Sequence, residues 1–340
     1  MAHQLEQRDR QSGRVNAWHN LTFLEPNGVT KEGAFPWEVE AVTVHLPDGS
    51  PLILSEDGKR KNVQILIASD DKKPIGLPFT ESYIYNTTQR FWDTIHKALE
   101  GVPFTVESAG SLKNRSRIFA SVKVAEDWKV GEREFKDYLT FLDSFDKSIS
   151  YESHYSSHCV VCANTAAMSI QDAIRRLNEK DSNAFRSKAR HSKNFVNNVD
   201  KVKKAVEDFI GVRALFKSAL EEFSSKPITV SKARETFMGF VTDEKTEEPS
   251  TRAVNTVERL GELFLSGKGN SGQTRLDLFS AATDFYSHES SGGENKTKQW
   301  ESSEFGNARV KKEEFFDLLT GSENGLKEVQ KRGAKLLALN

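Results

Sequence analysis

The segment from Phe104 to Val124 alternates between two kinds of side chain, and this period of two is typical of β-strands with one buried face. One set is apolar and can bury against a core: Ile118, Ala120, Val122 and Val124. The opposite set carries cations and one aromatic ring: Lys113, Arg115, Arg117, Phe119, Ser121 and Lys123. The pattern predicts a hairpin whose second face is basic and open to solvent.

The overall charge of the chain limits how such a face can be used. The 340 residues carry 48 basic and 49 acidic side chains, which excludes a uniformly basic coat but not a local basic patch. The two cysteines give no disulfide framework, and no run of about 18 apolar residues is present. We therefore expect a cytoplasmic protein without a membrane span, folded as two domains or as one elaborated domain.

The N-terminal half shows mainly strand patterns after a polar tail at residues 1–16, which is expected to be disordered. Strands are predicted on either side of a turn at residues 47–49 and again at residues 63–69. Residues 87–100 have helical spacing, with Thr87 or Thr88 as the N-cap and Gly101 as the stop. The hairpin follows, and two further strands at 134–145 and 148–161 are joined by a turn at Asp146 and Lys147.

The C-terminal half is helical in pattern. Helices are predicted at residues 164–178, 194–223, 254–265 and 276–288 and from about residue 310, with an acidic loop at 242–251 and a polar insert at 289–298. The chain therefore divides into the tail, an antiparallel domain at 17–170 and a mainly helical region at 171–340. The predicted class is α+β, with a helix–three-strand–helix core in the first half.

An ordered set of short segments resembles one protein family. The segments are AWHNL at 17–21, PWEVE at 36–40, the hairpin at 105–124, DSFDKSIS to CVVCANTAA at 143–167, GKGNSGQTRLDLFSAATDFYSHES at 267–290 and ESSEFGNARVKKEEFFDLL at 301–319. Together they look like the phage/plasmid-like proteins, a prokaryotic domain family of unknown function carried by bacteriophages and plasmids. The resemblance implies a bacterial host cell and a mobile-element setting, and it brings no catalytic residues. Residues 180–250 depart from the family pattern.

The order of elements between residues 87 and 173 is similar to the core of a second family. A helix, three antiparallel strands and another helix also form the core of the single-strand annealing proteins, which oligomerise and hold single-stranded DNA along a basic groove. This resemblance implies a homo-oligomeric DNA-binding protein. Many unrelated α+β folds share the same order, so it does not establish the function.

Two basic regions are candidates for binding a phosphate backbone. On the hairpin, cations would contact phosphates and the ring would stack on bases: Lys113, Arg115, Arg117, Phe119 and Lys123. The second region, residues 175–204, holds ten cations against three acids, and its candidate contacts are Arg175, Arg176, Arg186, Lys188 and Arg190. The alternative in both places is an ordinary solvated surface, with the hairpin cations protecting a sheet edge from aggregation.

A zinc site at His154, His158, Cys159 and Cys162 is not favoured. The two histidines lie in a segment with strand alternation, where residues four apart are separated by about 13 Å along the axis. Cysteine beside valine is also common in protein cores. The sequence therefore predicts no metal and no cofactor.

The glycine-rich run GKGNSGQT at residues 267–274 matches two nucleotide-binding motifs only by count. It follows a helix and not a strand, and Gln273 stands where a phosphate-binding loop requires lysine. We expect a helix C-cap followed by a new N-cap, with Ser271 or Thr274 supplying the oxygen. Backbone amides at that helix start could also hold a phosphate.

Acidic residues near one turn keep a nuclease among the possibilities. Asp143, Asp146 and Glu152 are close in sequence, but their spacing does not fix two of them on one side of a strand pair. The sequence therefore predicts a non-catalytic, oligomeric protein that binds single-stranded nucleic acid, and annealing or recombination is one role that such binding would serve. The alternative function is a host-interaction or counter-defence protein that acts by protein–protein contact, for which the polar middle segment and the acidic loop are suited.

Overall fold

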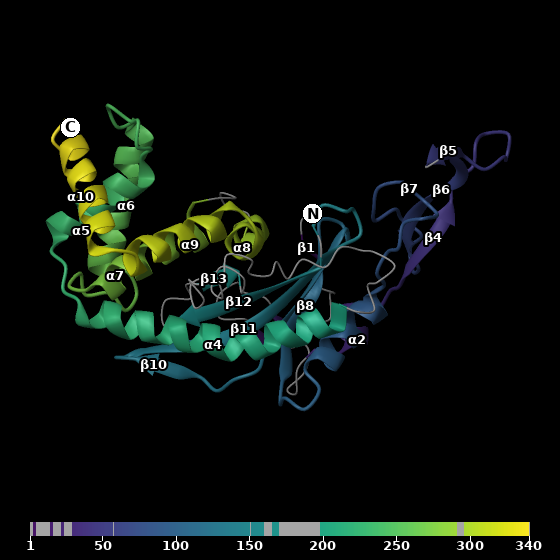
Figure 1. Ribbon diagram of the computed structural model, residues 1–340, viewed down its shortest axis with the longest axis horizontal. Coiled ribbons are helices and arrows are strands. Elements are labelled where there is room, and N and C mark those ends of the chain that lie inside the picture. The colour runs from purple at the N-terminus through teal and green to yellow at the C-terminus, as the bar shows by residue number, and fades with distance from the viewer. Residues whose placement is uncertain are drawn as a thin grey trace.

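The computed structural model describes residues 29–56, 58–149, 151–159, 165–169, 198–290 and 296–339, together with three two-residue strands nearer the N-terminus. Strands lie mostly in the first half of the chain and helices in the second, which confirms the α+β class (Figure 1). Most of the predicted tail at 1–16, and the basic candidates between residues 175 and 190, lie outside the described residues.

The main sheet is antiparallel and has the order β1-β8-β9-β11-β12-β13, with β10 paired to β11. Its strands are β1 (His3–Gln4), β8 (Thr105–Leu112), β9 (Arg117–Lys123), β10 (Trp128–Val130), β11 (Arg133–Ser144), β12 (Glu152–Cys159) and β13 (Thr165–Ser169). The predicted hairpin and the two strands after it are confirmed. The prediction of a helix from residue 164 is wrong over 165–169, because this segment pairs with β12 as a fifth strand of the meander.

A smaller sheet projects from one end of the main sheet (Figure 1). It has the order β4-β6-β5, with β7 also paired to β6. Its strands are β4 (Val39–Thr43), β5 (Ile53–Glu56), β6 (Lys59–Ala68) and β7 (Phe79–Thr80). The remaining pair, β2 (Arg14–Val15) and β3 (Thr22–Phe23), forms a separate two-stranded sheet.

One face of the main sheet packs against helices that flank it in the sequence. These are the short α1 (Lys31–Ala34), α2 (Thr88–Ala98) and the long α4 (Asn198–Ser225). The Thr87 side chain accepts a hydrogen bond from the Arg90 N–H at 3.0 Å, which starts α2 as predicted. Ile118, Ala120 and Val122 face these helices and are fully buried, so the apolar half of the hairpin pattern is confirmed.

The second face of the same sheet is covered by α8 (Lys296–Phe305), whose Phe305 packs on a small apolar cluster that the strands present. α7 (Arg275–His288) and α9 (Asn307–Thr320) contact the edge strand β13, and their Phe279 and Phe316 rings pack against Phe216 of α4. The other helices lie farther out and are α5 (Val230–Val241), α6 (Thr251–Ser266) and α10 (Glu323–Leu337). A sheet buried on both faces was not expected from the alternating pattern.

A close helix crossing holds the outer part together. A Cβ atom added at Gly333 of α10 would lie 1.8 Å from the Glu235 carbonyl oxygen of α5, and one added at Gly239 of α5 would lie 2.2 Å from the Val329 carbonyl oxygen. Both glycines therefore allow an approach that no larger residue permits. Among the described residues, no helix is sufficiently long and apolar to cross a membrane.

The glycine-rich loop between α6 and α7 joins the helices to the sheet. The Arg133 guanidinium group of β11 donates to the Gly269 carbonyl and forms a buried ion pair with Asp277. Gly267 is the C-cap of α6, and Thr274 is the N-cap of α7 in a capping box with Asp277, as the sequence predicts. The amides of Gln273 and Thr274 both donate to the Asp277 carboxylate at 3.0 Å, so these donors hold a carboxylate of the chain itself.

Candidate nucleic-acid interface

Three turns meet at one end of the main sheet, and we call residues 70–73, 113–117 and 146–148 the turn rim. Arg115 donates two hydrogen bonds to the Asp70 carboxylate, at 2.7 and 3.1 Å, which joins the first two turns. The Phe145 N–H donates to the Ser116 carbonyl at 2.8 Å and Arg117 Nε donates to Ser148 Oγ at 3.0 Å, which joins the second and third. The rim is therefore one connected surface made by segments up to 78 residues apart in the sequence.

The backbone of the rim is strained. In the part of the chain that the structure describes, the residues other than glycine with positive φ are Lys72 (56°), Lys113 (50°), Asn114 (54°), Arg115 (68°) and Lys147 (62°), and all five lie in these three turns. The left-handed region is costly for side chains with a Cβ, and such residues gather at functional sites when the surrounding structure holds them. Four of the five are cations, so the strain and the positive charge coincide.

The lysines of the rim are exposed and only weakly held. Lys72 pairs with Glu40 at 2.7 Å and keeps 61% of its side chain exposed, while Lys113 lies 3.4 Å from Glu301 of α8 and is 45% exposed. Ion pairs of this kind contribute about 0–1 kcal/mol. A phosphate group can therefore replace their carboxylate partners at little cost.

The two arginines of the hairpin do not project into solvent as the sequence predicts. Arg115 lies over the Trp37 ring, 5.0 Å from its centroid, and 15% of its side chain is exposed. Arg117 lies 3.4 Å from Glu301 and is 16% exposed. The prediction of an open row of three cations is wrong, because two of the three are used to fasten neighbouring turns and α8 to the hairpin.

The prediction that Phe119 is open for base stacking is also wrong. Its ring is fully buried, with the Phe305 ring of α8 at a centroid distance of 6.4 Å. Lys123 lies at the far end of β9 and pairs with Asp127 at 2.7 Å, so it is about 20 Å along the strand from Arg117. The face that alternation assigns to solvent is instead the side on which α8 packs.

An aromatic cluster stands beside the rim. The Lys147 ammonium group lies 4.4 Å from the centroid of the Tyr83 ring, and the Phe79 ring is 5.3 Å from that of Tyr83. Tyr83 is half-buried, and burial together with the charges of Asp143 and Asp146 raises the pKa of its hydroxyl to about 12. Tyr83 thus stays neutral near pH 7 and can present a ring next to a cation.

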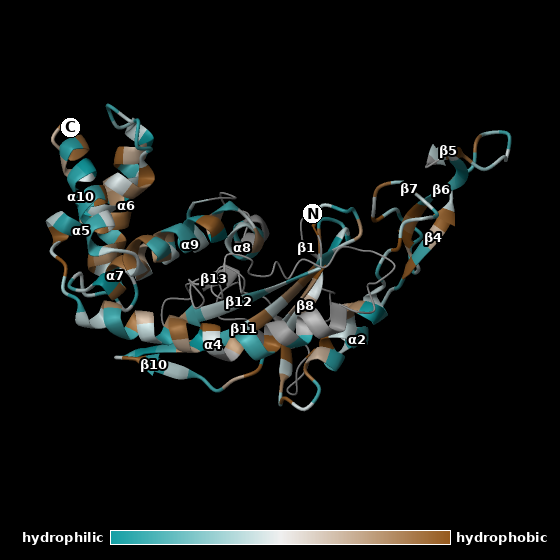
Figure 2. Cartoon of the chain, viewed as in Figure 1, coloured by the Kyte–Doolittle hydropathy of each residue, from teal (hydrophilic) through white to brown (hydrophobic). Residues whose placement is uncertain are grey.

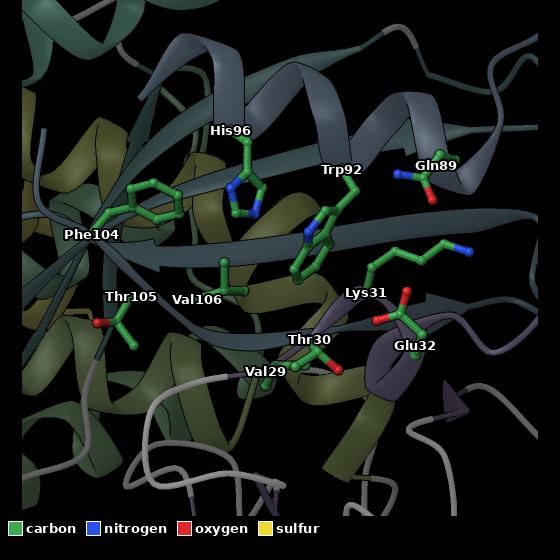
Figure 3. Close-up of a pocket in the computed structure, with 10 residues that line it drawn as sticks. All are labelled: Val29, Thr30, Lys31, Glu32, Gln89, Trp92, His96, Phe104, Thr105 and Val106. Atoms are coloured by element: carbon green, nitrogen blue, oxygen red, sulfur yellow. The ribbon is translucent and has the colours of Figure 1, made fainter. Parts of the chain in front are cut away.

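A separate pocket of about 450 Å³ opens between α1, α2 and the start of β8 (Figure 3). Trp92 and His96 reach into it from α2 and Phe104 closes one side, with the His96 ring centroid 5.0 Å from that of Phe104. Burial lowers the pKa of His96, which favours a neutral ring. The pocket offers ring surfaces in place of free cations, and this suits a flat apolar group better than a phosphate.

The second face of the main sheet also holds a closed polar cluster. Ser156 Oγ lies 2.7 Å from His158 Nε2 and 3.1 Å from the Glu304 carboxylate of α8. Ser156 and His158 are buried, so this contact between a hydroxyl and an imidazole is shut off from a substrate. Its role in the folded chain is to fasten α8 to β12.

The other candidate residues are dispersed. His154 and His158 lie on the α8 side of β12 while Cys159 packs in the main core, and Cys162 lies outside the described residues. Asp143 accepts from Asn86 in the interior at 2.7 Å, whereas Glu152 lies near His154 on the other face. Over the described ranges, no group of three or more metal-binding side chains is present.

Sequence reasoning missed several residues that shape the rim. Lys147 was placed in the correct turn but not recognised as a cation of the site, and Lys72 lies in a loop that gave no pattern. Glu301 lies in one of the segments that carry the family resemblance, but no role was predicted for it. Its partners Lys113 and Arg117 are more than 180 residues away in the sequence. The sequence signal that could have located these turns is the pair of aspartates Asp70 and Asp146, because aspartate favours turns.

A comparison with protein-family models places most of the chain in one family. The matching family is described as "Domain of unknown function (DUF932)", and it covers residues 79–319, which include the hairpin, the main sheet and most of the helices over it. No curated protein and no solved structure matches the chain. The chain therefore belongs to the DUF932 domain family.

Proposed function

We propose that this protein binds single-stranded nucleic acid at the turn rim as a non-catalytic binder. The observation that carries the proposal is the coincidence of four cations, all in strained left-handed backbone, within three turns that contact one another. Strain of this kind persists only where the surrounding structure holds it, and here it holds positive charge at one place. A phage or plasmid setting in a bacterial cell, which the family resemblance implies, would suit such a protein.

Phosphates would bind by exchange with carboxylates at the surface. Lys72, Lys113 and Lys147 would contact the phosphate backbone, while Arg115 and Arg117 hold the turns in position. Tyr83 would stack on an exposed base, an interaction worth about 1–3 kcal/mol. Most of the affinity would come from the release of counterions, so it would fall steeply with salt.

The single-stranded form is favoured because the ring beside the cations can stack only on an unpaired base. The order of elements supports the same class of ligand: α2, the antiparallel strands β8, β9 and β11, and later α4 follow the order found in the core of single-strand annealing proteins. Two further strands, β12 and β13, extend the meander before α4. An annealing role would be one use of such binding.

The test is a triple substitution of the exposed lysines, Lys72→Ala, Lys113→Ala and Lys147→Ala. Binding of a fluorescent oligonucleotide is followed by anisotropy at several salt concentrations. Loss of three phosphate contacts should weaken binding and reduce the slope of log affinity against log salt by about 2. A tyrosine variant, Tyr83→Leu, should weaken binding with little change in that slope.

The matched control removes three lysines of similar exposure that are paired elsewhere: Lys129, Lys232 and Lys311. Alanine at these positions changes the net charge equally but leaves the rim intact. If the control variant loses as much affinity and slope as the rim variant, binding is a general charge effect and the proposed site is wrong. If the unmodified protein binds no oligonucleotide at low salt, the proposed function itself is wrong.

A further inference from the structure

The pocket between α1, α2 and the start of β8 is lined by aromatic rings (Figure 3). α2 carries both hydrophilic and hydrophobic residues along its length (Figure 2), and it brings the buried Trp92 and the exposed His96 to the pocket. The His96 ring centroid lies 5.5 Å from that of Trp92 and 5.0 Å from that of the half-buried Phe104. The volume of about 450 Å³ is within the range of about 300–1,000 Å³ that is usual for small-molecule sites. A flat ring that enters the pocket therefore meets aromatic surface.

The charged groups of the pocket do not favour an anion. Lys31 belongs to the lining, but its ammonium group lies 2.8 Å from the Glu38 carboxylate and its side chain is 14% exposed. Glu32 adds a carboxylate to the lining. Burial lowers the pKa of His96, so its ring is neutral near pH 7. The pocket therefore suits an uncharged part of a ligand.

The neutral polar groups of the pocket match the edge of a nucleobase. A neutral imidazole such as that of His96 carries one N–H donor and one nitrogen acceptor. Gln89 donates one amide N–H to Asp93 at 2.8 Å, and a glutamine amide has a second N–H and a carbonyl oxygen as well. Nucleobases present donors and acceptors around a flat ring. Aromatic surface together with such donors and acceptors therefore fits a nucleobase.

The pocket lies next to the turn rim. The Glu38 N–H donates to the hydroxyl of Ser69, the residue before the first turn of the rim, at 2.8 Å. The Glu38 carboxylate accepts from the N–H of Gln89, in the pocket lining, at 3.1 Å. The preceding residue, Trp37, has the guanidinium group of Arg115 5.0 Å from its ring centroid. Two adjacent residues thus connect the rim with the pocket, so one extended ligand can occupy both.

We propose that the pocket receives one base of the single strand whose phosphates lie on the turn rim. This inference rests on the function proposed above and adds a second base-binding position to that of Tyr83. A ligand that extends from the pocket onto the cations of the rim has to combine a flat ring with negative charge, and a single strand of nucleic acid does so. Stacking on aromatic side chains tolerates every base, so the pocket would take a base without reading the sequence.

The test compares an oligonucleotide with an abasic strand of the same length and charge, and both are followed by fluorescence anisotropy. Two variants act on the pocket: His96→Ala removes an exposed ring, and Thr105→Trp fills the space from β8. Each should weaken binding of the oligonucleotide at least about fivefold, the lower end of what stacking of one base contributes. Affinity for the abasic strand and the salt dependence should stay the same, because no phosphate contact is lost.

Matched controls place the same changes outside the pocket. His45→Ala removes an exposed histidine that follows β4, and Thr43→Trp adds an indole ring at a half-buried position of β4. Both should bind the two strands like the unmodified protein, and circular dichroism checks that all four variants keep the fold. The triple lysine variant of the rim, in contrast, should lose affinity for both strands.

The results separate this proposal from the function on which it rests. Unchanged oligonucleotide affinity in both pocket variants, or an equal loss for the abasic strand or in the controls, would overturn the base pocket and leave the rim as the binding site. Free adenosine is titrated as a further probe, and adenosine that binds more tightly than the oligonucleotide would identify a nucleoside pocket instead. If the unmodified protein binds neither strand at low salt, the proposed function itself is wrong.

Discussion

The guanidinium group of Arg117 lies 3.4 Å from the carboxylate of Glu301, although 184 residues separate the two in the chain. Glu301 also reaches Lys113, so one acidic side chain of α8 neutralises two cations of the hairpin. A carboxylate in this position competes with any phosphate that approaches the turn rim. Its removal should therefore strengthen binding of a polyanion.

Glu301→Gln should raise the affinity for single-stranded oligonucleotide about two- to fivefold at low salt, since it removes a competing charge worth about 0.5–1 kcal/mol. Anisotropy titration measures the change. Glu314→Gln removes a carboxylate that is paired with Lys311 on α9, away from the rim, and serves as the matched control. Equal affinity for the Glu301 variant and the unmodified protein would show that Lys113 and Arg117 are not part of the binding surface.

The buried pair of Arg133 and Asp277 should dominate the attachment of the helices to the sheet. Arg133→Met leaves Asp277 with its charge in the interior, and loss of one partner of a buried pair costs about 3–5 kcal/mol. Urea unfolding followed by circular dichroism measures the loss. Arg259→Met, which removes an exposed pair with Glu289, should change the free energy of unfolding by less than about 1 kcal/mol.

Two helical glycines should respond to alanine in opposite directions. Gly333→Ala places a Cβ at 1.8 Å from the Glu235 carbonyl oxygen and must push α5 and α10 apart, which should cost about 1–3 kcal/mol or more. At Gly261 of α6 the nearest atom would be Arg234 Cγ at 3.9 Å, so alanine fits and should stabilise the helix by about 1 kcal/mol. Thermal unfolding of the two variants compares them directly, and a stabilised Gly333→Ala would contradict the close crossing.

Lys312 should make the stability depend on pH in the alkaline range. Burial lowers the pKa of its ammonium group to about 8, although the charge of Glu304 acts in the other direction. Between pH 8 and the pKa of about 10.4 in the unfolded chain, the unfolded state binds more protons than the folded state, so the free energy of unfolding rises with pH. From pH 8 to 9.5 the gain should be about 1–2 kcal/mol.

The measurement compares urea unfolding of the unmodified protein with that of Lys312→Met at pH 8.0, 8.75 and 9.5. Both proteins contain the buried tyrosines such as Tyr138 and Tyr155, so the protons that these lose from the unfolded state near pH 10 affect both curves equally. The methionine variant should lack the additional rise. Parallel curves for the two proteins would mean that Lys312 has an ordinary pKa.

The sequence alone was sufficient to predict the features that depend on residues close together in the chain. Alternation identified the buried face of β9, and the threonines before α2 and α7 were recognised as caps because capping depends on residues three positions apart. The turn after β11 was likewise read from Asp146 and Lys147. These features belong to the strands and helices themselves, so a short window contains the information.

The contacts between distant segments were not predictable. Phe119 has the same spacing on the strand whether water or α8 covers it, and α8 carries few apolar residues that would mark it as a core helix. The segment at 165–169 is too short and too rich in alanine for its period to separate strand from helix. Arg133 and Glu301 gained their roles from partners far along the chain, and those depend on the tertiary fold.

At the left-handed positions of the three turns, the residue that would give the highest stability differs from the residue that would give the highest affinity for nucleic acid. Glycine would adopt the backbone of Lys72, Lys113 or Lys147 without strain, so Lys→Gly variants there should melt at higher temperature while they hold nucleic acid less tightly. Selection for thermal stability alone would therefore be expected to replace the lysines of the turn rim early.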